Sequence, residues 1–236
     1  MSTYVLVHGG GGSAWDWHLV TAELRVRGNE VIAPDLPCDD PRAGWEDYAE
    51  AVVAAVPTEL LEQRSGLVLV AHSLGSFTAP LACERLRPDL LVLVAPMVPA
   101  PGESAAQWWE STGHAEAQEA RARAEGWSVD GGVEEIFLHD VPPDLAAEAL
   151  SRARDESSAA FTAPWPLAGW PDVPTRVLLA ADDRIFPLDF SRRLVRQRLG
   201  LKADDLPGGH YLAVSRSREL ADRLEEYADE VLGTRD

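Results

Sequence analysis

The 236-residue sequence predicts a single α/β domain built on a doubly wound, mostly parallel β-sheet. Two observations support this prediction. Short runs rich in Val and Leu recur along the chain, and stretches with the apolar spacing of helices separate them. Runs without polar alternation are typical of parallel strands that are buried on both faces, and strands that alternate with helices place helices on both sides of the sheet.

The expected strands and helices follow one another in chain order. The strands are the apolar runs YVLV at 4–7, VIA at 31–33, LVLVA at 67–71, LLVLVA at 90–95 and RVLLA at 176–180. The segments between and after them carry apolar residues at helical spacing, which predicts helices over 14–27, 45–61, 77–86, 188–199 and 216–232.

The alternation of strands and helices breaks between residue 97 and about residue 171, where the sequence becomes rich in Ala, Glu and Trp. We expect helices here, inserted after the strand at Leu90–Val94, with residues 1–96 and 172–236 forming the core of the one domain. An insertion at this point lies at the carboxyl ends of the parallel strands, where open α/β sheets bind ligands. Residues 97–171 are therefore predicted to form a small helical lid.

Composition and charge exclude several classes of partner. The formal net charge of −18 repels phosphate backbones and anionic lipid headgroups, so neither nucleic acid nor a membrane surface is an expected partner. The sequence has no run of membrane-spanning length and no signal-peptide pattern at its start, which predicts a cytoplasmic protein. Cys38 and Cys83 are too few for a disulfide framework or a metal cluster, and we expect two buried thiols.

The stretch LVAHSLGSF at residues 69–77 contains the first candidate catalytic residue. Ser73 follows an expected buried strand and precedes an expected helix, in the pattern Ala71-x-Ser73-x-Gly75. Small residues two positions to either side are typical of a sharp strand-to-helix turn that holds a nucleophilic serine, because the chain comes close to itself there. The backbone N–H of Leu74, at the start of the helix, is the expected donor to an oxyanion. The alternative is that Ser73 only caps the helix.

A nucleophilic serine needs a histidine as base and a carboxylate to orient it, and both occur downstream. The segment VLLAADDRIFP places Asp182 and Asp183 directly after a buried strand, and we choose Asp183 as the acid. In PGGHYLAVS two glycines permit a tight turn that presents His210, the predicted base. Taken singly, Asp183 could be a turn residue and His210 a locally hydrogen-bonded histidine. Serine, acid and histidine nevertheless occur in the order that such a fold requires, which favours a triad.

The segment HGGGGSAWDW after the first expected strand supplies a second candidate oxyanion donor, the backbone N–H of Gly10. Its glycines let the backbone approach a reacting carbonyl closely. The run lacks the Lys-Ser/Thr ending and the glycine spacing of nucleotide-binding loops, so nucleotide binding is not predicted. The histidines outside the site show no metal-ligand spacing, and neither a metal nor another cofactor is expected.

These segments resemble the α/β-hydrolase superfamily over nearly the whole chain. HGGGGSAWDW, VAHSLGS, AADDRIFP and GGHYLAVSRSRELADRL are similar to its oxyanion loop, nucleophile turn, acid loop and histidine loop. The beginning and the end of the sequence resemble more narrowly the small esterase branch with plant methyl esterases, hydroxynitrile lyases and related bacterial hydrolases. The resemblance implies a Ser-His-Asp hydrolase without a cofactor, which cleaves an ester, thioester or related acyl compound through an acyl-enzyme.

Two departures bear on the reaction that this resemblance implies. Members of the superfamily with an aspartate nucleophile are disfavoured because residue 73 is serine. The hydroxynitrile lyases that resemble this branch carry a lysine after the histidine, whereas Tyr211 follows His210 here, which disfavours lyase activity. A ligand receptor, or an enzyme that uses the same site for cyclisation, elimination or carbon–carbon cleavage, stays open as the second class of function. A structural scaffold ranks last, because it would leave the serine turn and the glycine run unexplained.

The expected substrate is a small, largely apolar acyl compound. Candidates for an apolar acyl or alcohol pocket are Trp108, Trp109, Phe137 and Phe161, each of which could instead pack in the core. Anionic substrates are expected to bind weakly unless a local arginine offsets the acidic surface. The sequence leaves open whether the chain forms a homodimer.

Overall fold

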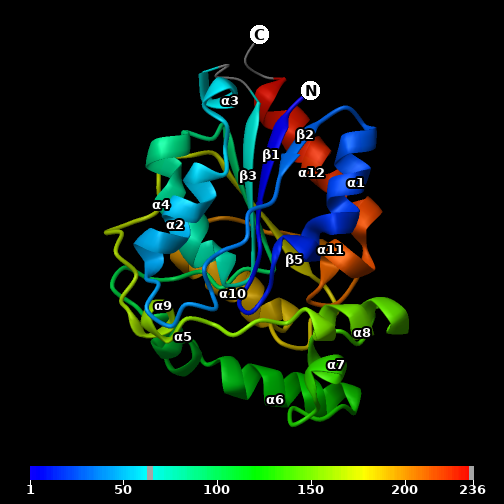
Figure 1. Ribbon diagram of the computed structural model, residues 1–236. Coiled ribbons are helices and arrows are strands. Elements are labelled where there is room, and N and C mark those ends of the chain that lie inside the picture. Colours follow the sequence, from blue (N-terminus) through cyan, green and yellow to red (C-terminus); the bar gives the residue numbers. More distant parts are fainter. Residues whose placement is uncertain (63–65, 234–236) are drawn as a thin grey trace.

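A six-stranded parallel sheet runs through the centre of the molecule (Figure 1). The computed structural model describes residues 1–62 and 66–233, so residues 63–65 and 234–236 of the two predicted core ranges lie outside the described residues. Within the described residues every strand pairing is parallel, in the order β2-β1-β3-β4-β5-β6. The strands are β1 (Thr3–Val7), β2 (Glu30–Ile32), β3 (Leu67–His72), β4 (Leu90–Val94), β5 (Thr175–Ala180) and β6 (Asp204–Leu206).

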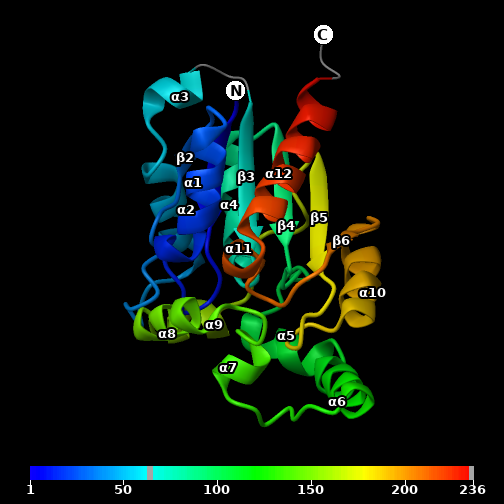
Figure 2. The same ribbon diagram turned by 90° about the vertical axis from the view of Figure 1, so that its right-hand side faces the viewer.

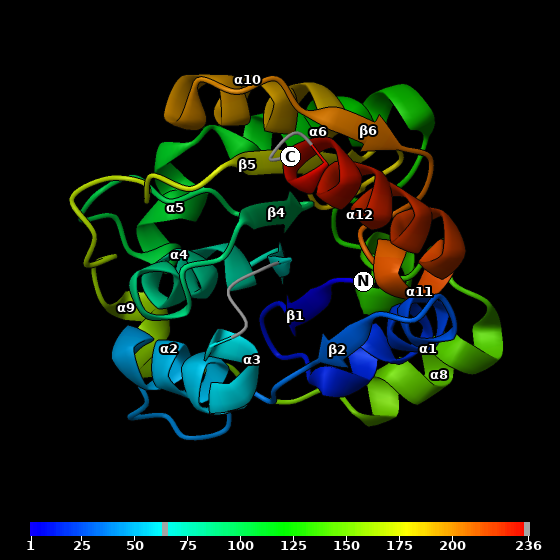
Figure 3. The same ribbon diagram turned by 90° about the horizontal axis from the view of Figure 1, so that it is seen from above.

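Helices cover both faces of this sheet, as Figure 3 shows in the view from above. Apolar residues of α2, α4 and α10 pack on one face, and those of α1 and α12 pack on the other. The predicted doubly wound fold is therefore confirmed. The helices of this core are η1 (Ala14–Trp17), α1 (His18–Val26), α2 (Trp45–Ala54), α3 (Thr58–Glu62), α4 (Gly75–Leu86), α10 (Leu188–Leu199), α11 (Leu212–Ser215) and α12 (Ser217–Leu232).

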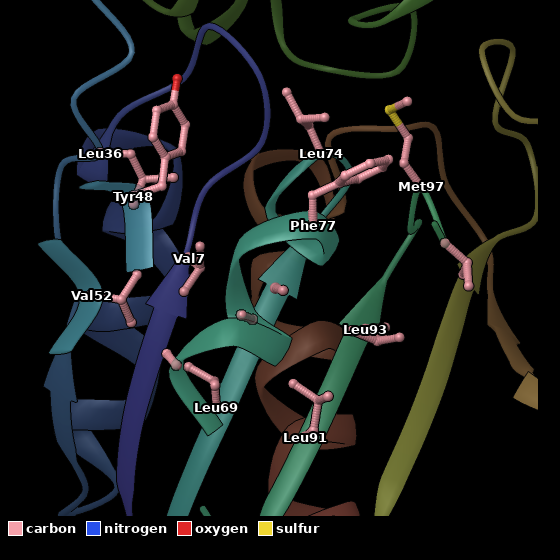
Figure 4. Packing of buried hydrophobic residues seen from close by; sticks show 14 of the residues in the cluster. Val7, Leu36, Tyr48, Val52, Leu69, Leu74, Phe77, Leu91, Leu93 and Met97 are labelled. Carbon is pink, nitrogen blue, oxygen red and sulfur yellow. The ribbon is translucent and has the colours of Figure 1, made fainter. Parts of the chain in front are cut away.

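Side chains of each central strand alternate between two apolar clusters. In β3, Leu69 belongs to the cluster beneath α2 and α4, whereas Val70 belongs to the cluster beneath α1 and α12. Every residue of β3 and β4 is buried, because helices lie on both sides of these strands. Figure 4 shows the first cluster, where Val52 of α2 and Phe77 of α4 join Leu69 and Leu91 of the sheet.

Two of the expected helices are divided in the structure. The helix expected over 45–61 ends at Ala54 and restarts at Thr58, because Pro57 between them has no N–H to continue the helical hydrogen bonds. The helix expected over 14–27 begins as the 3₁₀ turn η1, where Ser13 accepts a hydrogen bond from the N–H of Trp15 and the side chain of Asp16 binds back to the N–H of Ser13.

The remaining boundaries differ from the predictions by a few residues. Helix α4 begins at Gly75, two residues before the prediction, and α11 forms a separate turn ahead of α12. Strand β6 was not among the predicted apolar runs. Its sequence is Asp-Asp-Leu, and it lies at the edge of the sheet, where one side of a strand has no neighbouring strand to bury it.

The segment between β4 and β5, residues 97–171, contains five helices within the described residues and lies at the carboxyl end of the sheet (Figure 2). We call it the inserted segment. Two tryptophan side chains join it to the core by hydrogen bonds. Trp45 of α2 donates to the carbonyl of Ala163, and Trp165 donates to the carbonyl of Phe77. Its helices are α5 (Ala105–Ser111), α6 (His114–Glu125), α7 (Val133–Ile136), α8 (Pro143–Ser151) and α9 (Ser158–Thr162).

None of the helices in the described part of the chain is both long and apolar enough to cross a lipid bilayer.

The packing of β3 leads to a prediction on stability. Val70→Ala removes two buried methyl groups from a residue that is 0% exposed, and it should lower the free energy of unfolding by about 2 kcal/mol. Val26→Ala is the matched control, because Val26 is 89% exposed, and it should change the free energy by less than about 0.5 kcal/mol. Urea unfolding measures both, and equal effects of the two variants would contradict the described core.

Candidate active site

Ser73 lies in a sharp turn between β3 and α4. Its φ of +51° is in the left-handed region, which a non-glycine residue adopts only when its surroundings hold it there. Two hydrogen bonds hold this turn against β4 and the chain after it: the N–H of Ser73 donates to the carbonyl of Val94, and the carbonyl of Ser73 accepts from the N–H of Met97. The side chain of Ser73 is thus presented at the carboxyl end of the central strands.

Glycines permit the loop after β1 to press against this turn. A Cβ atom at Gly75 would lie 2.6 Å from the carbonyl oxygen of His8, and one at Gly9 would lie 3.1 Å from the Cβ of Ser73. The first contact involves backbone, so no side chain fits at residue 75 without moving a strand end. The pattern of small residues around Ser73 therefore has a steric cause.

Asp183 and His210 meet at the carboxyl end of the sheet, although 27 residues separate them in the sequence. Asp183 follows β5 and His210 follows β6, and Nδ1 of His210 donates a hydrogen bond of 2.8 Å to Oδ2 of Asp183. The other carboxylate oxygen accepts hydrogen bonds from the N–H groups of Ile185 and Phe186, at 2.8 and 2.9 Å. These bonds fix the orientation of the carboxylate. Because Nδ1 of His210 carries the proton donated to Asp183, the unprotonated nitrogen of the neutral ring is Nε2.

Aromatic rings hold the imidazole of His210 on several sides. Phe186 and Phe137 meet it edge-on, with centroids 5.1 and 5.5 Å away, and the ring of His72 lies 4.7 Å away. His72 also donates a hydrogen bond of 3.0 Å from Nε2 to the carbonyl of His210. Burial, and then the nearby His210, hold the pKa of His72 well below its ordinary value, so His72 stays neutral and acts as a hydrogen-bond donor.

A cavity of about 230 Å³ opens at these residues. Ser73 and His210 both line it, together with Gly9, Gly10 and Gly11 of the loop after β1. Ser73, Asp183 and His210 are only 8%, 3% and 1% exposed, so the cavity brings a substrate to groups that are otherwise shielded from water. The inserted segment supplies a largely apolar wall, made of Val133, Phe137, Leu138, Ala149, Leu150, Ala153 and Arg154.

The two predicted oxyanion donors lie next to each other, and Gly10 lines this cavity. A Cβ atom at Gly10 would lie 3.0 Å from Cδ2 of Leu74, which shows how closely the two residues approach. Within residues 1–62 and 66–233, neither backbone N–H donates a hydrogen bond to a protein acceptor. Leu74 is also the N-cap of α4, where unpaired N–H groups favour negative charge.

Of the four predicted pocket aromatics, the structure places only Phe137 along this cavity. Trp108 is fully buried instead, since its indole N–H donates to the carbonyl of Val98 and its ring packs against Phe186. Trp109 packs against His114 and Phe186, and Phe161 packs on the core beneath α2 and α4. The expectation for these three residues is corrected: their large rings contribute to packing between the inserted segment and the core.

Sequence reasoning missed the aliphatic wall of the cavity and the residues that hold its glycine loop. Ala149 and Leu150 of α8 and Ala153 after it supply part of that wall. The helical spacing of the segment PPDLAAEAL could have indicated a buried face, but not which cavity this face would border.

Among the described residues, no group of three or more His, Cys, Asp and Glu side chains is arranged to hold a metal ion.

The chain is similar to known proteins in sequence and in structure. The model of the "Alpha/beta hydrolase family" matches residues 4–223. "Probable esterase PIR7A" of Oryza sativa subsp. indica is 38% identical over 114 residues, which cover 42% of this chain and 41% of that protein. The match thus spans about two fifths of the rice protein's length.

Two further relatives match over nearly the full length. "Norfluorocurarine synthase 1" of a Strychnos species is 24% identical, with 97% of this chain and 96% of that protein covered. The crystal structure of polyneuridine aldehyde esterase superimposes with a TM-score of 0.76 at 21% identity, and the match covers 97% of this chain and 100% of the other. This structural likeness shows a shared fold.

His8 leads to a prediction on the pH dependence of stability. It is fully buried at the end of β1, and burial lowers its pKa from the ordinary 6.5 to about 4. Between pH 6.5 and about pH 4, His8 is protonated in the unfolded chain but neutral in the folded protein. The free energy of unfolding therefore falls as the pH drops, by roughly 3 kcal/mol between pH 7 and pH 4. His8→Gln keeps an acceptor for the N–H of Leu36 but cannot titrate. Urea unfolding at both pH values should show a smaller loss for this variant, and equal losses would contradict the assignment.

Proposed function

The chain belongs to the alpha/beta hydrolase family, and from this premise we propose that it is a serine hydrolase that cleaves a small carboxylic ester or thioester through an acyl-enzyme. The observation that carries the proposal is the hydrogen bond from His210 to Asp183 at the cavity that Ser73 also lines. A cap role for Ser73 would explain neither its left-handed backbone nor a buried imidazole that lines the same cavity.

In the first half of the proposed reaction, Oγ of Ser73 attacks the acyl carbonyl while Nε2 of His210 takes its proton. Asp183 accepts the Nδ1 hydrogen bond, which keeps the required tautomer and stabilises the imidazolium. The N–H groups of Gly10 and Leu74 stabilise the charge that develops on the carbonyl oxygen. When the tetrahedral intermediate collapses, His210 returns the proton to the departing alcohol or thiol.

In the second half, water attacks the acyl-enzyme while His210 takes its proton, and the Ser73 oxygen leaves with that proton from His210 as the carbonyl re-forms. The acid product carries the acyl group away and the free serine is restored. No cofactor takes part in these steps.

The cavity supports a small and largely apolar substrate. Its volume of about 230 Å³ suits a short acyl group, and the inserted segment, in the role of a lid, limits that length. Arg154 lines the cavity, but its Nε and Nη2 both bind Oδ2 of Asp39 at 2.6 Å. Its Nη1 is buried without a hydrogen-bond partner among the described residues, and the net charge of −18 still disfavours anionic substrates.

A second candidate is a reaction on the same residues that is not hydrolysis. The observation that favours it is the likeness, over 97% of this chain, to a protein named as a synthase. The products distinguish the two candidates: the proposed hydrolase releases an acid and an alcohol or thiol in equal amounts, and the alternative does not.

Ser73→Ala tests the proposed nucleophile. It should lower the turnover of p-nitrophenyl butyrate by at least about 10⁴-fold, because the attacking oxygen is lost while the fold is kept. Ser76→Ala is the matched control: Ser76 lies three residues later at the start of α4, is fully buried and has a hydroxyl without a hydrogen-bond partner in the described structure. It should keep wild-type turnover. Equal turnover of wild type and Ser73→Ala would refute the nucleophile.

The size of the cavity leads to a prediction on chain length. p-Nitrophenyl acetate and butyrate should have values of kcat/KM roughly tenfold or more above that of the dodecanoate, because the long chain does not fit. Phe137→Ala widens the cavity and should narrow this ratio, whereas Phe161→Ala, outside the cavity lining, should leave it unchanged. A wild-type preference for the long ester would contradict the proposed pocket.

A further inference from the structure

Glu156, in the connection between α8 and α9, is hydrogen-bonded to the glycine loop after β1. Its Oε2 accepts a hydrogen bond of 3.0 Å from the N–H of Gly11, a residue 145 positions away in the sequence. Two residues earlier, the N–H of Arg154 donates a hydrogen bond of 2.8 Å to the carbonyl of Gly11. Both backbone groups of Gly11 are therefore bound by one short stretch of the inserted segment.

Gly11 adjoins Gly10, the proposed oxyanion donor, and the packing there leaves little freedom. A Cβ atom at Gly10 would lie 3.3 Å from Oε2 of Glu156, and one at Gly11 would lie 2.8 Å from the carbonyl oxygen of Arg154. Gly11 also has a φ of +62°, a conformation that glycine adopts without strain. The position of the Gly10 N–H consequently depends on the hydrogen bonds made by Gly11.

The other end of the Glu156 carboxylate is anchored in the core. Oε1 accepts a hydrogen bond from the hydroxyl of Tyr48 in α2, whose ring is buried against Trp45. The next residue, Ser157, is fully buried and donates from Oγ to the carbonyl of Ala43 at 2.7 Å. The carboxylate therefore links the glycine loop to a rigid part of the fold, which is what a positioning group requires.

A negative charge at this place has no electrostatic benefit for the proposed reaction, because negative charge also develops at the oxyanion site. Burial raises the pKa of the Glu156 carboxyl, while the hydrogen bonds from Tyr48, Gly11 and Ser157 and the nearby Arg154 act in the opposite direction. The site needs Oε2 of Glu156 as a hydrogen-bond acceptor for the Gly11 N–H, and it needs a side chain as long as that of glutamate to place this oxygen.

We propose that Glu156 is a positioning residue, which acts through its hydrogen bond to the Gly11 N–H to hold the Gly10 N–H at the oxyanion site. This inference rests on the proposed function. It assigns the inserted segment a part in transition-state stabilisation in addition to lining the cavity.

Two conservative variants distinguish the effect of the length of the Glu156 side chain from the effect of its charge. Glu156→Gln keeps the length of the side chain and an oxygen for the Gly11 N–H but removes the charge, and Glu156→Asp keeps the charge but is one methylene too short. We expect Glu156→Asp to lower kcat on p-nitrophenyl butyrate roughly tenfold to a hundredfold with KM within about twofold, because a small misplacement of a transition-state donor lowers the rate that much. Glu156→Gln should stay within about threefold of wild type.

Binding of a short alkylboronic acid supplies a second readout. The boron atom accepts the Ser73 oxygen to form a tetrahedral adduct, the serine proton passes to His210, and one boron-bound oxygen occupies the oxyanion site. The inhibition constant should rise for Glu156→Asp in parallel with the loss of kcat and change little for Glu156→Gln. Glu148→Asp is the matched control, since Glu148 of α8 pairs with Arg152 at the surface. All variants are compared below their melting temperatures.

The outcomes distinguish this inference from the proposed function. Wild-type kcat and boronate affinity in Glu156→Asp would overturn the inference, and so would an equal loss in both Glu156 variants or a loss that appears only in KM or in the melting temperature. A wild-type protein without turnover and without a boron adduct at Ser73 would instead refute the proposed function.

Discussion

The close approach between the loop after β1 and the turn after β3 is the constraint on which the rest of this site depends. A Cβ atom at Gly75 would lie only 2.6 Å from the carbonyl oxygen of His8, so glycine at residue 75 is needed for the two strand ends to stay adjacent. The same approach places Gly9 and Gly10 against Ser73 and Leu74. Ser73 has its left-handed backbone at this contact, and among the described residues the N–H groups of Gly10 and Leu74 donate to no protein acceptor.

The parallel sheet makes this constraint chemically useful. Because parallel strands end at the same edge, Ser73 after β3, Asp183 after β5 and His210 after β6 converge there. Ser73 is held by backbone hydrogen bonds to β4 and the chain after it, and the Asp183 carboxylate by the N–H groups of Ile185 and Phe186. His210 is held by its hydrogen bonds to Asp183 and His72. The inserted segment lies at the same edge and hydrogen-bonds to the loop that carries Asp183, from His139 to the carbonyl of Asp182. Preorganisation of this kind removes the need to arrange the groups during the reaction.

Much of the fold was predictable from the sequence because its signals are local. Unbroken apolar runs predicted five of the strands, and Leu188–Leu199 was predicted to its ends. The sequence also predicted the strand-end positions of Asp183 and His210, whose side chains are hydrogen-bonded in the structure. Strand β6 was missed because an edge strand needs no apolar run. Trp108 was misplaced because burial in a core and exposure to a cavity produce the same sequence pattern, and the contact between Gly11 and Glu156 joins residues too distant in sequence for any periodicity to reveal.

The central claim is that Ser73, His210 and two backbone N–H groups act on one carbonyl group. The most direct measurement is a crystal structure of the protein after reaction with an alkyl phosphonate ester that modifies nucleophilic serines. The account predicts a single phosphorus atom bonded to Oγ of Ser73, with a phosphonyl oxygen within hydrogen-bond distance of the N–H groups of Gly10 and Leu74, and Nε2 of His210 facing the adduct. Modification of another residue, or an adduct at Ser73 whose oxygen points away from both N–H groups, would contradict it.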